Sequence, residues 1–185
     1  GLASAVQFSA ALAIIACSIW KQSHPTAALA FVYGYLSCMF SLAHGQPDLA
    51  LLSAFALAAG AAGLRRLKGW AAPLAIAAPF SFLILFIVAV AVWIAEKGGP
   101  VSPAIAFSYP LGFLAVFLLS DWSEAWRGRA MSARPRRWLM TFAGAAAAGI
   151  GFLIAHQLFR GALADYYFLF GGVFLAFAFA LYVVA

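Results

Sequence analysis

The chain has 185 residues, of which 66% are apolar and only 9% are charged, and its mean hydropathy is +1.01. Soluble domains carry charges on about a quarter of their residues, so this composition excludes a soluble globular domain. A net charge of +6 would suggest a nucleic-acid partner in a soluble protein, but here the cations lie in short segments beside apolar runs, where they match lipid head groups. We therefore expect an integral membrane protein that binds no nucleic acid.

Several apolar runs are long enough to cross a hydrocarbon core of roughly 30 Å as helices. None alternates polar and apolar residues as the strands of a membrane barrel do. The expected fold class is therefore all-α, a polytopic transmembrane helical bundle. In chain order, seven spans are expected at residues 2–20, 27–44, 49–64, 70–95, 104–120, 138–159 and 166–185.

The connections between the spans contain strong turn and helix-breaking residues. Gly45, Gln46 and Pro47 form a turn after the second span, and Asp48 is placed to cap the third helix. In the fourth span, Pro73 and Pro79 predict a kink or a tilt.

The basic residues predict the orientation. Residues 121–137 form the longest polar segment, with five of the eleven cations, and are interpreted as a cytoplasmic loop. Connections after spans 1, 3 and 5 hold one, three and five cations, whereas those after spans 2, 4 and 6 hold none, one and one. The positive-inside rule then places the N-terminus outside and the C-terminus in the cytoplasm, as expected in a bacterial inner membrane. All six tryptophans fall at predicted span ends, where an aromatic belt is expected.

The chain is expected to form a single transmembrane domain, residues 1–185. Because it begins with Gly1 rather than Met and ends at Ala185 inside an apolar run, it is also expected to be a fragment of a longer protein.

A short pattern, A-x-A-F-x-Y, occurs in the second span and again in the fifth. The first copy ends at Tyr33 and is followed by Gly34, and the second ends at Tyr109 and is followed by Pro110. An offset of three spans inverts the topology, and inverted repeats with weakened helices at matching places build many transporters. The alternative is a chance match, because the four shared residues are common in membrane helices.

Small residues recur four apart in the third and sixth spans. They are Ala54, Ala58, Ala59 and Gly63 in the third span, and Gly144, Ala145, Ala148 and Gly149 in the sixth. Such faces allow helices to approach closely in lipid. They predict either a tight helix pair that braces a transport path or the generic packing of an Ala-rich protein.

Polar residues gather at the predicted outer ends of the spans: His44, Gln46, Asp48, Glu96, His156 and Asp165. Their imidazoles and carboxylates are candidate ligands for a metal such as zinc, or a receiving point for a proton or cation. The alternative is that short outer connections are simply polar and solvated. Among these residues His156 is the first to test, because it lies beside Gln157 on an otherwise apolar span.

The sequence contains no hydrolytic, phosphate-binding or haem motif, so no cofactor is predicted and an enzyme is the least favoured class. No Asp, Glu, Lys or Arg lies in the middle of a predicted span, which argues against proton-coupled transport. The polar groups expected at depth are Gln7, Tyr33, Tyr35, Ser37, Ser41, Ser81, Tyr109 and Thr141.

These features favour a membrane pathway, resembling a transporter or channel, for a small neutral or lipidic molecule. One alternative is a non-catalytic membrane subunit of a larger complex, and another is the membrane sensor domain of a longer signalling protein. The expected partners are the lipid bilayer and either other membrane subunits or further copies of the chain.

Overall fold

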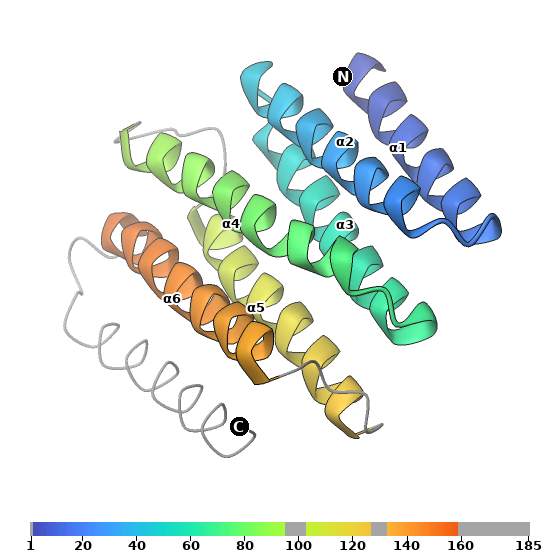
Figure 1. The fold of residues 1–185 in the computed structure, drawn as a ribbon. Coiled ribbons are helices and arrows are strands. Elements are labelled where there is room, and N and C mark those ends of the chain that lie inside the picture. Colours follow the sequence, from blue (N-terminus) through green and yellow to red (C-terminus); the bar gives the residue numbers. More distant parts are fainter. Residues whose placement is uncertain (1, 95–102, 127–132, 159–185) are drawn as a thin grey trace. The chain divides into compact units, whose positions relative to one another are not determined.

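The computed structural model describes residues 2–94, 103–126 and 133–158. These ranges form six helices, α1 (Leu2–Trp20), α2 (His24–Ala43), α3 (Pro47–Lys68), α4 (Ala71–Ile94), α5 (Pro103–Trp126) and α6 (Ala133–Leu158) (Figure 1). They contain no strand, so the all-α prediction is confirmed for them. Three helical segments, namely α2, α3 and residues 71–91 of α4, are long and apolar enough to cross a membrane. The predicted seventh span, residues 166–185, lies outside the described ranges.

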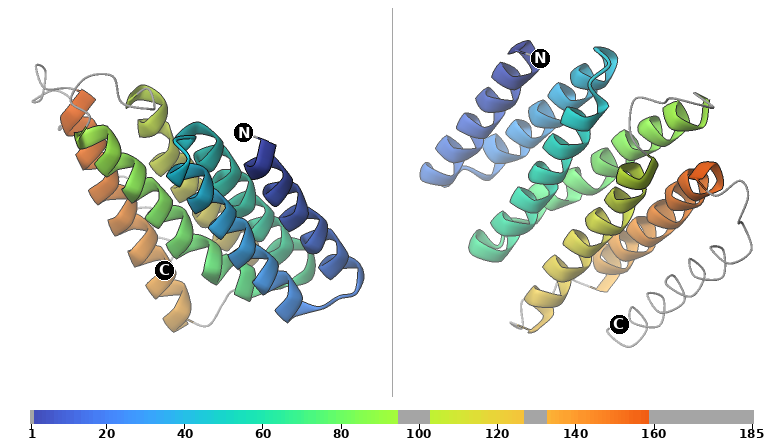
Figure 2. Two further views of the ribbon diagram at one scale, coloured as in Figure 1. Left: turned by 90° about the horizontal axis from the view of Figure 1, so that it is seen from above. Right: turned by 180° about the vertical axis from the view of Figure 1, so that it is seen from behind.

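The chain forms two compact units, Gly1–Leu85 (unit 1) and Phe86–Ala185 (unit 2). In unit 1, α2 packs against both α1 and α3 (Figures 1 and 2). Gly34 allows the close approach, because a Cβ atom there would lie 3.0 Å from both terminal methyl groups of Leu57 and 3.6 Å from the Cβ of Ala11. Small residues at such crossings let membrane helices approach closely enough for van der Waals contact along their length.

In unit 2, α5 packs against α6. The largest buried side chains on α5 are Phe113 and Phe117, and those of α6 include Ile154. The rings of Trp138 and Phe142, one turn apart on α6, are stacked with centroids 5.3 Å apart. The buried side chains described on α5 and α6 thus include phenylalanine and aliphatic residues, whereas Trp138 is 58% exposed.

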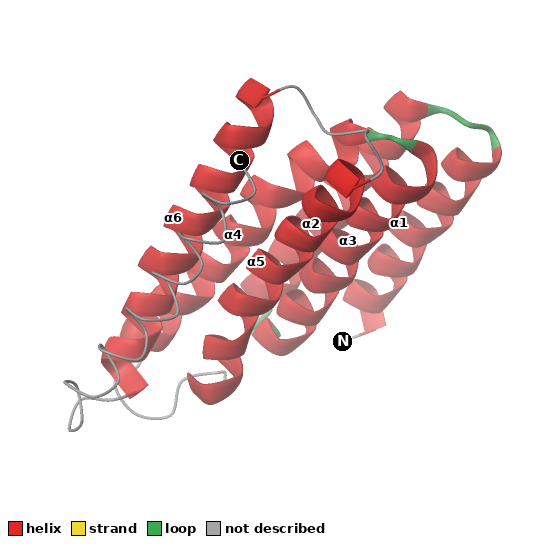
Figure 3. Ribbon diagram, turned by 90° about the horizontal axis from the view of Figure 1, so that it is seen from below, coloured by secondary structure: helices red, strands yellow, loops and turns green. Residues whose placement is uncertain are grey.

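The first six predicted spans each correspond to a helix, but the helix ends differ from the predicted ones. The three described connections, residues 21–23, 44–46 and 69–70, are short (Figure 3). Proline accounts for two of the differences, because it is favoured in the first turn of a helix, where its missing N–H is not needed. Pro25 lies in the first turn of α2 and Pro47 begins α3, so both helices start earlier than expected. Asp48 therefore lies inside the first turn of α3, and Gln46 is the cap residue. The prediction that Asp48 caps this helix is wrong; its charge instead complements the positive end of the helix dipole.

The interpretation of residues 121–137 as one long loop is also wrong. Helix α5 continues to Trp126 and α6 begins at Ala133, so most of the segment is helical. No Gly or Pro interrupts residues 121–126, and a helix continues through polar residues when nothing breaks it. Asp121, expected in a solvated loop, is completely buried.

Candidate functional site

A buried pair of hydroxyl groups joins the helices of unit 1. The Tyr35 hydroxyl of α2 lies 2.8 Å from Ser81 Oγ of α4. It also donates a longer hydrogen bond of 3.5 Å to the backbone carbonyl of Ala54 in α3. We call Tyr35, Ser81 and the Ala54 carbonyl the hydroxyl node. It links three helices through neutral groups.

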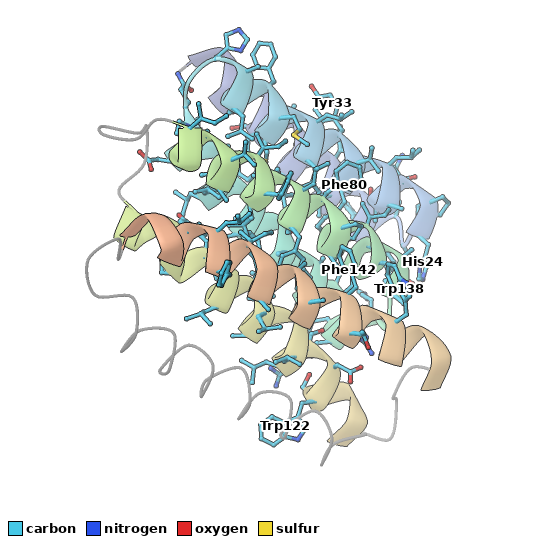
Figure 4. The ribbon with its side chains drawn as sticks, turned by 90° about the vertical axis from the view of Figure 1, so that its left-hand side faces the viewer. His24, Tyr33, Phe80, Trp122, Trp138 and Phe142 are labelled. Carbon is cyan, nitrogen blue, oxygen red and sulfur yellow. The ribbon has the colours of Figure 1, made fainter. Side chains whose placement is uncertain are left out.

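Burial and ring stacking fix Tyr35 in place. Its side chain has no exposed surface, and its ring stacks on Phe80 with centroids 5.6 Å apart. Phe80 lies on α4 in unit 1 (Figure 4). Phe80 and Ser81 directly follow Pro79, which lies inside α4 and cannot donate the helical hydrogen bond to the Ala75 carbonyl. Helix α4 is therefore weakened next to the two residues that hold Tyr35.

Three other serine hydroxyls of unit 1 are satisfied within their own helices. Ser18 Oγ donates to the Ile14 carbonyl at 2.7 Å, and Ser37 Oγ donates to the Tyr33 carbonyl at 3.0 Å. Ser41 Oγ donates to the carbonyl of Ser37 at 3.1 Å. Bonds to the carbonyl four residues earlier are usual for serine in membrane helices. The hydroxyl node differs from them because it connects separate helices.

The four candidate residues at the two A-x-A-F-x-Y copies differ in exposure. Tyr33 is 40% exposed and points away from the other helices of unit 1, whereas Gly34 is buried (Figure 4). In α5, Tyr109 is half-buried and Pro110 is buried. The helix-weakening residue that follows each copy, Gly34 or Pro110, is thus buried. The tyrosine of the hydroxyl node is Tyr35, two residues beyond the pattern.

The small residues of α6 meet no neighbour at two positions. A Cβ atom at Gly144 or at Gly149 would have no other atom within 4 Å. Gly149 is exposed and Gly144 is half-buried. The close helix contact expected at these two glycines is therefore absent from the described part of unit 2.

The proposed outer cluster of metal ligands is described only at His44 and Asp48. Both side chains are exposed. Glu96 and Asp165 lie outside the described residues, as does the side chain of His156. Within the described ranges, no group of three or more His, Cys, Asp or Glu side chains is arranged to hold a metal ion.

His44 has a structural role at the end of α2. Its Nδ1 atom lies 2.8 Å from the Phe40 carbonyl, and its ring lies 3.9 Å from the Phe40 ring. Because a carbonyl only accepts, Nδ1 carries the proton in this contact. The backbone N–H of His44 donates to the same Phe40 carbonyl at 3.1 Å, so the imidazole adds a second hydrogen bond to a carbonyl at the end of α2.

We expect His44→Ala to leave the zinc content of the purified protein unchanged and to lower its unfolding free energy by about 0.5–1 kcal/mol, because only an exposed capping hydrogen bond is lost. Elemental analysis and thermal unfolding check the two effects, with Asp48→Asn as a second variant from the same end. If both variants lost stoichiometric zinc, the result would contradict this expectation and support a metal site at His44 and Asp48.

The described ranges define a class: they are all helical, include helices long and apolar enough to cross a membrane, and join separate helices of the first unit through a buried pair of hydroxyl groups. Comparison of the chain with protein-family models, with curated proteins and with solved structures finds no match in any of the three.

Proposed function

We propose that this protein spans a bacterial inner membrane seven times, with its N-terminus outside and its C-terminus in the cytoplasm, and forms or contributes to a pathway for a small neutral or lipidic molecule. The observation that carries the proposal is the hydroxyl node, in which Tyr35 and Ser81 meet at 2.8 Å between helices that are apolar enough to cross a membrane.

The charge distribution of unit 1 supports a neutral cargo. Its five charged residues lie at the ends of helices or in turns: Lys21, Asp48, Arg65, Arg66 and Lys68. Pathways for ions commonly carry charged side chains or rings of backbone carbonyls at depth. A tyrosine and a serine instead offer one neutral donor and acceptor pair to a hydroxyl, amide or carbonyl of the cargo.

The position of the hydroxyl node beside Pro79 supports a conformational change of α4 during transport. Hydrogen bonds between membrane helices contribute only about 0.6 kcal/mol on average and about 1.7 kcal/mol at most. A cargo molecule can replace such a bond at little cost. Bending of α4 at Pro79, where one backbone hydrogen bond is missing, would then separate Ser81 from Tyr35.

Flux through liposomes tests the proposal. We expect the purified full-length protein to raise the flux of a small neutral solute, or the exchange of a labelled lipid between leaflets, above that of protein-free vesicles. Tyr35→Phe and Ser81→Ala should each change this flux by about threefold to twentyfold, the factor that one interhelical hydrogen bond represents. Ser41→Ala is the matched control, because its hydroxyl bonds within its own helix. Absence of flux across the solute and lipid panel, or equal flux in all four proteins, would contradict the proposal.

A second candidate function, a non-catalytic subunit of a larger membrane complex, is favoured by Gly144 and Gly149, where a Cβ atom would meet no atom of the described residues within 4 Å. The mass of the native assembly in gentle detergent distinguishes the two. Larger partners that co-purify in a fixed ratio, and that are lost from the Gly144→Leu variant, would support the function as a subunit. A monomer or a symmetric oligomer of this chain alone would support the pathway.

A further inference from the structure

One face of α2 carries a row of large exposed side chains. Leu29, Tyr33, Leu36 and Phe40 are 69%, 40%, 55% and 36% exposed. They lie four, three and four positions apart, so they share one side of the helix. We call these four residues the α2 seam. In a helix that crosses a membrane, such a row faces either acyl chains or another helix.

Tyr33 differs from the rest of the α2 seam because it carries a hydroxyl near the middle of the helix. Helix α2 runs from His24 to Ala43, so Tyr33 lies about 14 Å from either end at a rise of about 1.5 Å per residue. Tyrosines of membrane proteins usually place their hydroxyl at the level of the head groups. From the middle of α2, the side chain of Tyr33 is too short to do so.

The hydroxyl of Tyr33 also lacks a partner within the described part of the chain. The one side-chain hydrogen bond at this residue comes from Ser37 and uses the backbone carbonyl of Tyr33. The ring points away from the other helices of unit 1 (Figure 4). Acyl chains offer no hydrogen-bonding group, so a hydroxyl left among them costs free energy. A polar group on another helix would remove this cost.

A second copy of the chain supplies a hydroxyl at the matching depth. Two copies enter a membrane in the same orientation, because the same basic residues orient both of them. A two-fold axis along the membrane normal then brings each residue on the axis against its own copy, at the same depth. A tyrosine hydroxyl both donates and accepts, so it can bond to its copy. Any other partner would need a polar group placed at this depth independently.

The spacing of the α2 seam fits a pair of such helices. Steps of four, three and four residues are those of the a and d positions of a coiled coil, whose helices cross at about +20°. Most helix bundles in membranes have the same left-handed crossing. Leu29 and Leu36 then pack against their copies on either side of Tyr33. A single polar residue in such a row fixes the register of the pair.

We propose that two copies of this chain pair through the α2 seam, with the two Tyr33 hydroxyls hydrogen-bonded to each other at the two-fold axis. The inference rests on the proposal that α2 crosses the membrane, but it does not depend on transport. It gives the partner of this face as a second copy of the chain rather than lipid or another protein.

Self-association of the full-length protein in lipid bilayers tests the pairing. Protein with one fluorophore per chain is reconstituted at a range of protein-to-lipid ratios, and dimers are counted by single-molecule photobleaching. We expect the dimer fraction to rise with protein density, and Tyr33→Phe to raise the dissociation constant by about threefold to twentyfold, the factor for one interhelical hydrogen bond. A monomer at every ratio, or equal dissociation constants for the wild type and Tyr33→Phe, would overturn the proposal.

Cysteine cross-linking tests which face is used. In a background of Cys17→Ser and Cys38→Ala, Leu36→Cys places a thiol on the α2 seam. Leu52→Cys is the matched control, because Leu52 on α3 is 59% exposed and lies outside the seam. A disulfide needs Cα atoms within about 7 Å, so oxidation in the membrane should link two copies through Leu36→Cys but not through Leu52→Cys. Cross-linking of Leu52→Cys, no cross-linking in either variant, or linkage of Leu36→Cys to another protein would overturn the proposal.

The liposome flux described above is a separate readout. Flux without dimers would reject the pairing through the α2 seam and leave the pathway standing. Dimers that depend on Tyr33 but show no flux would reject the pathway and leave the pairing standing.

Discussion

Replacing Tyr35 with alanine is expected to lower the free energy of unfolding by about 3–5 kcal/mol, the range found when a large buried side chain is truncated. Tyr35 has no exposed surface, stacks on Phe80, and shares a hydrogen bond with Ser81. Its truncation would leave a cavity between three helices and remove the partner of a buried hydroxyl. Unfolding in mixed micelles, followed by circular dichroism, measures the loss.

Tyr35→Phe is the matched control for this prediction, because it keeps the ring and removes only the hydroxyl. We expect it to cost about 1 kcal/mol. Ser81→Ala should cost a similar amount, and the double variant should cost less than the two combined, since both remove the same hydrogen bond. If Tyr35→Ala were no more destabilising than Tyr35→Phe, the ring would not be buried as described.

Gly34→Val is expected to destabilise the protein by about 2–3 kcal/mol through overpacking. A Cβ atom at this position would already lie 3.0 Å from both terminal methyl groups of Leu57, and valine adds two further carbon atoms. The buried Leu57 side chain would have to shift to make room for them.

A second substitution reveals the cause of this effect. Leu57→Ala removes the two methyl groups, so the double variant Gly34→Val, Leu57→Ala should be more stable than the two separate losses predict. Gly63→Val on α3 is the control, because a Cβ atom there meets nothing within 4 Å. Equal destabilisation by Gly34→Val and Gly63→Val would show that the loss comes from valine in a helix and not from the contact with Leu57.

The number and order of the first six helices follow from the sequence because they depend on local properties. An apolar run of about twenty residues satisfies its own backbone as a helix, whatever surrounds it. Helix ends depended on finer rules. Pro25 and Pro47 lie between the predicted spans, although proline fits the first helical turn. The polar residues after Ser120 resemble a loop, although nothing there breaks the helix.

The candidate site was less accessible from the sequence. Tyr35 and Ser81 stood out as polar residues at depth, but they are 46 positions apart, and helix packing alone decides that they meet. Local spacing drew attention to Tyr33 instead, which points outward. His44 looked like a possible ligand because a sequence cannot show that its Nδ1 atom is engaged by the carbonyl one turn earlier.

The hydrogen bonds of Ser18, Ser37 and Ser41 have a consequence for biogenesis. Each hydroxyl is satisfied inside its own helix, so in the proposed topology α1 and α2 can enter the bilayer one after the other without exposing these groups to lipid. The bond between Tyr35 and Ser81 has to wait until α4 has been inserted, since Ser81 lies on that helix. Insertion of α4 is therefore the step at which Ser81 becomes available to Tyr35 and at which α2 becomes hydrogen-bonded to α4.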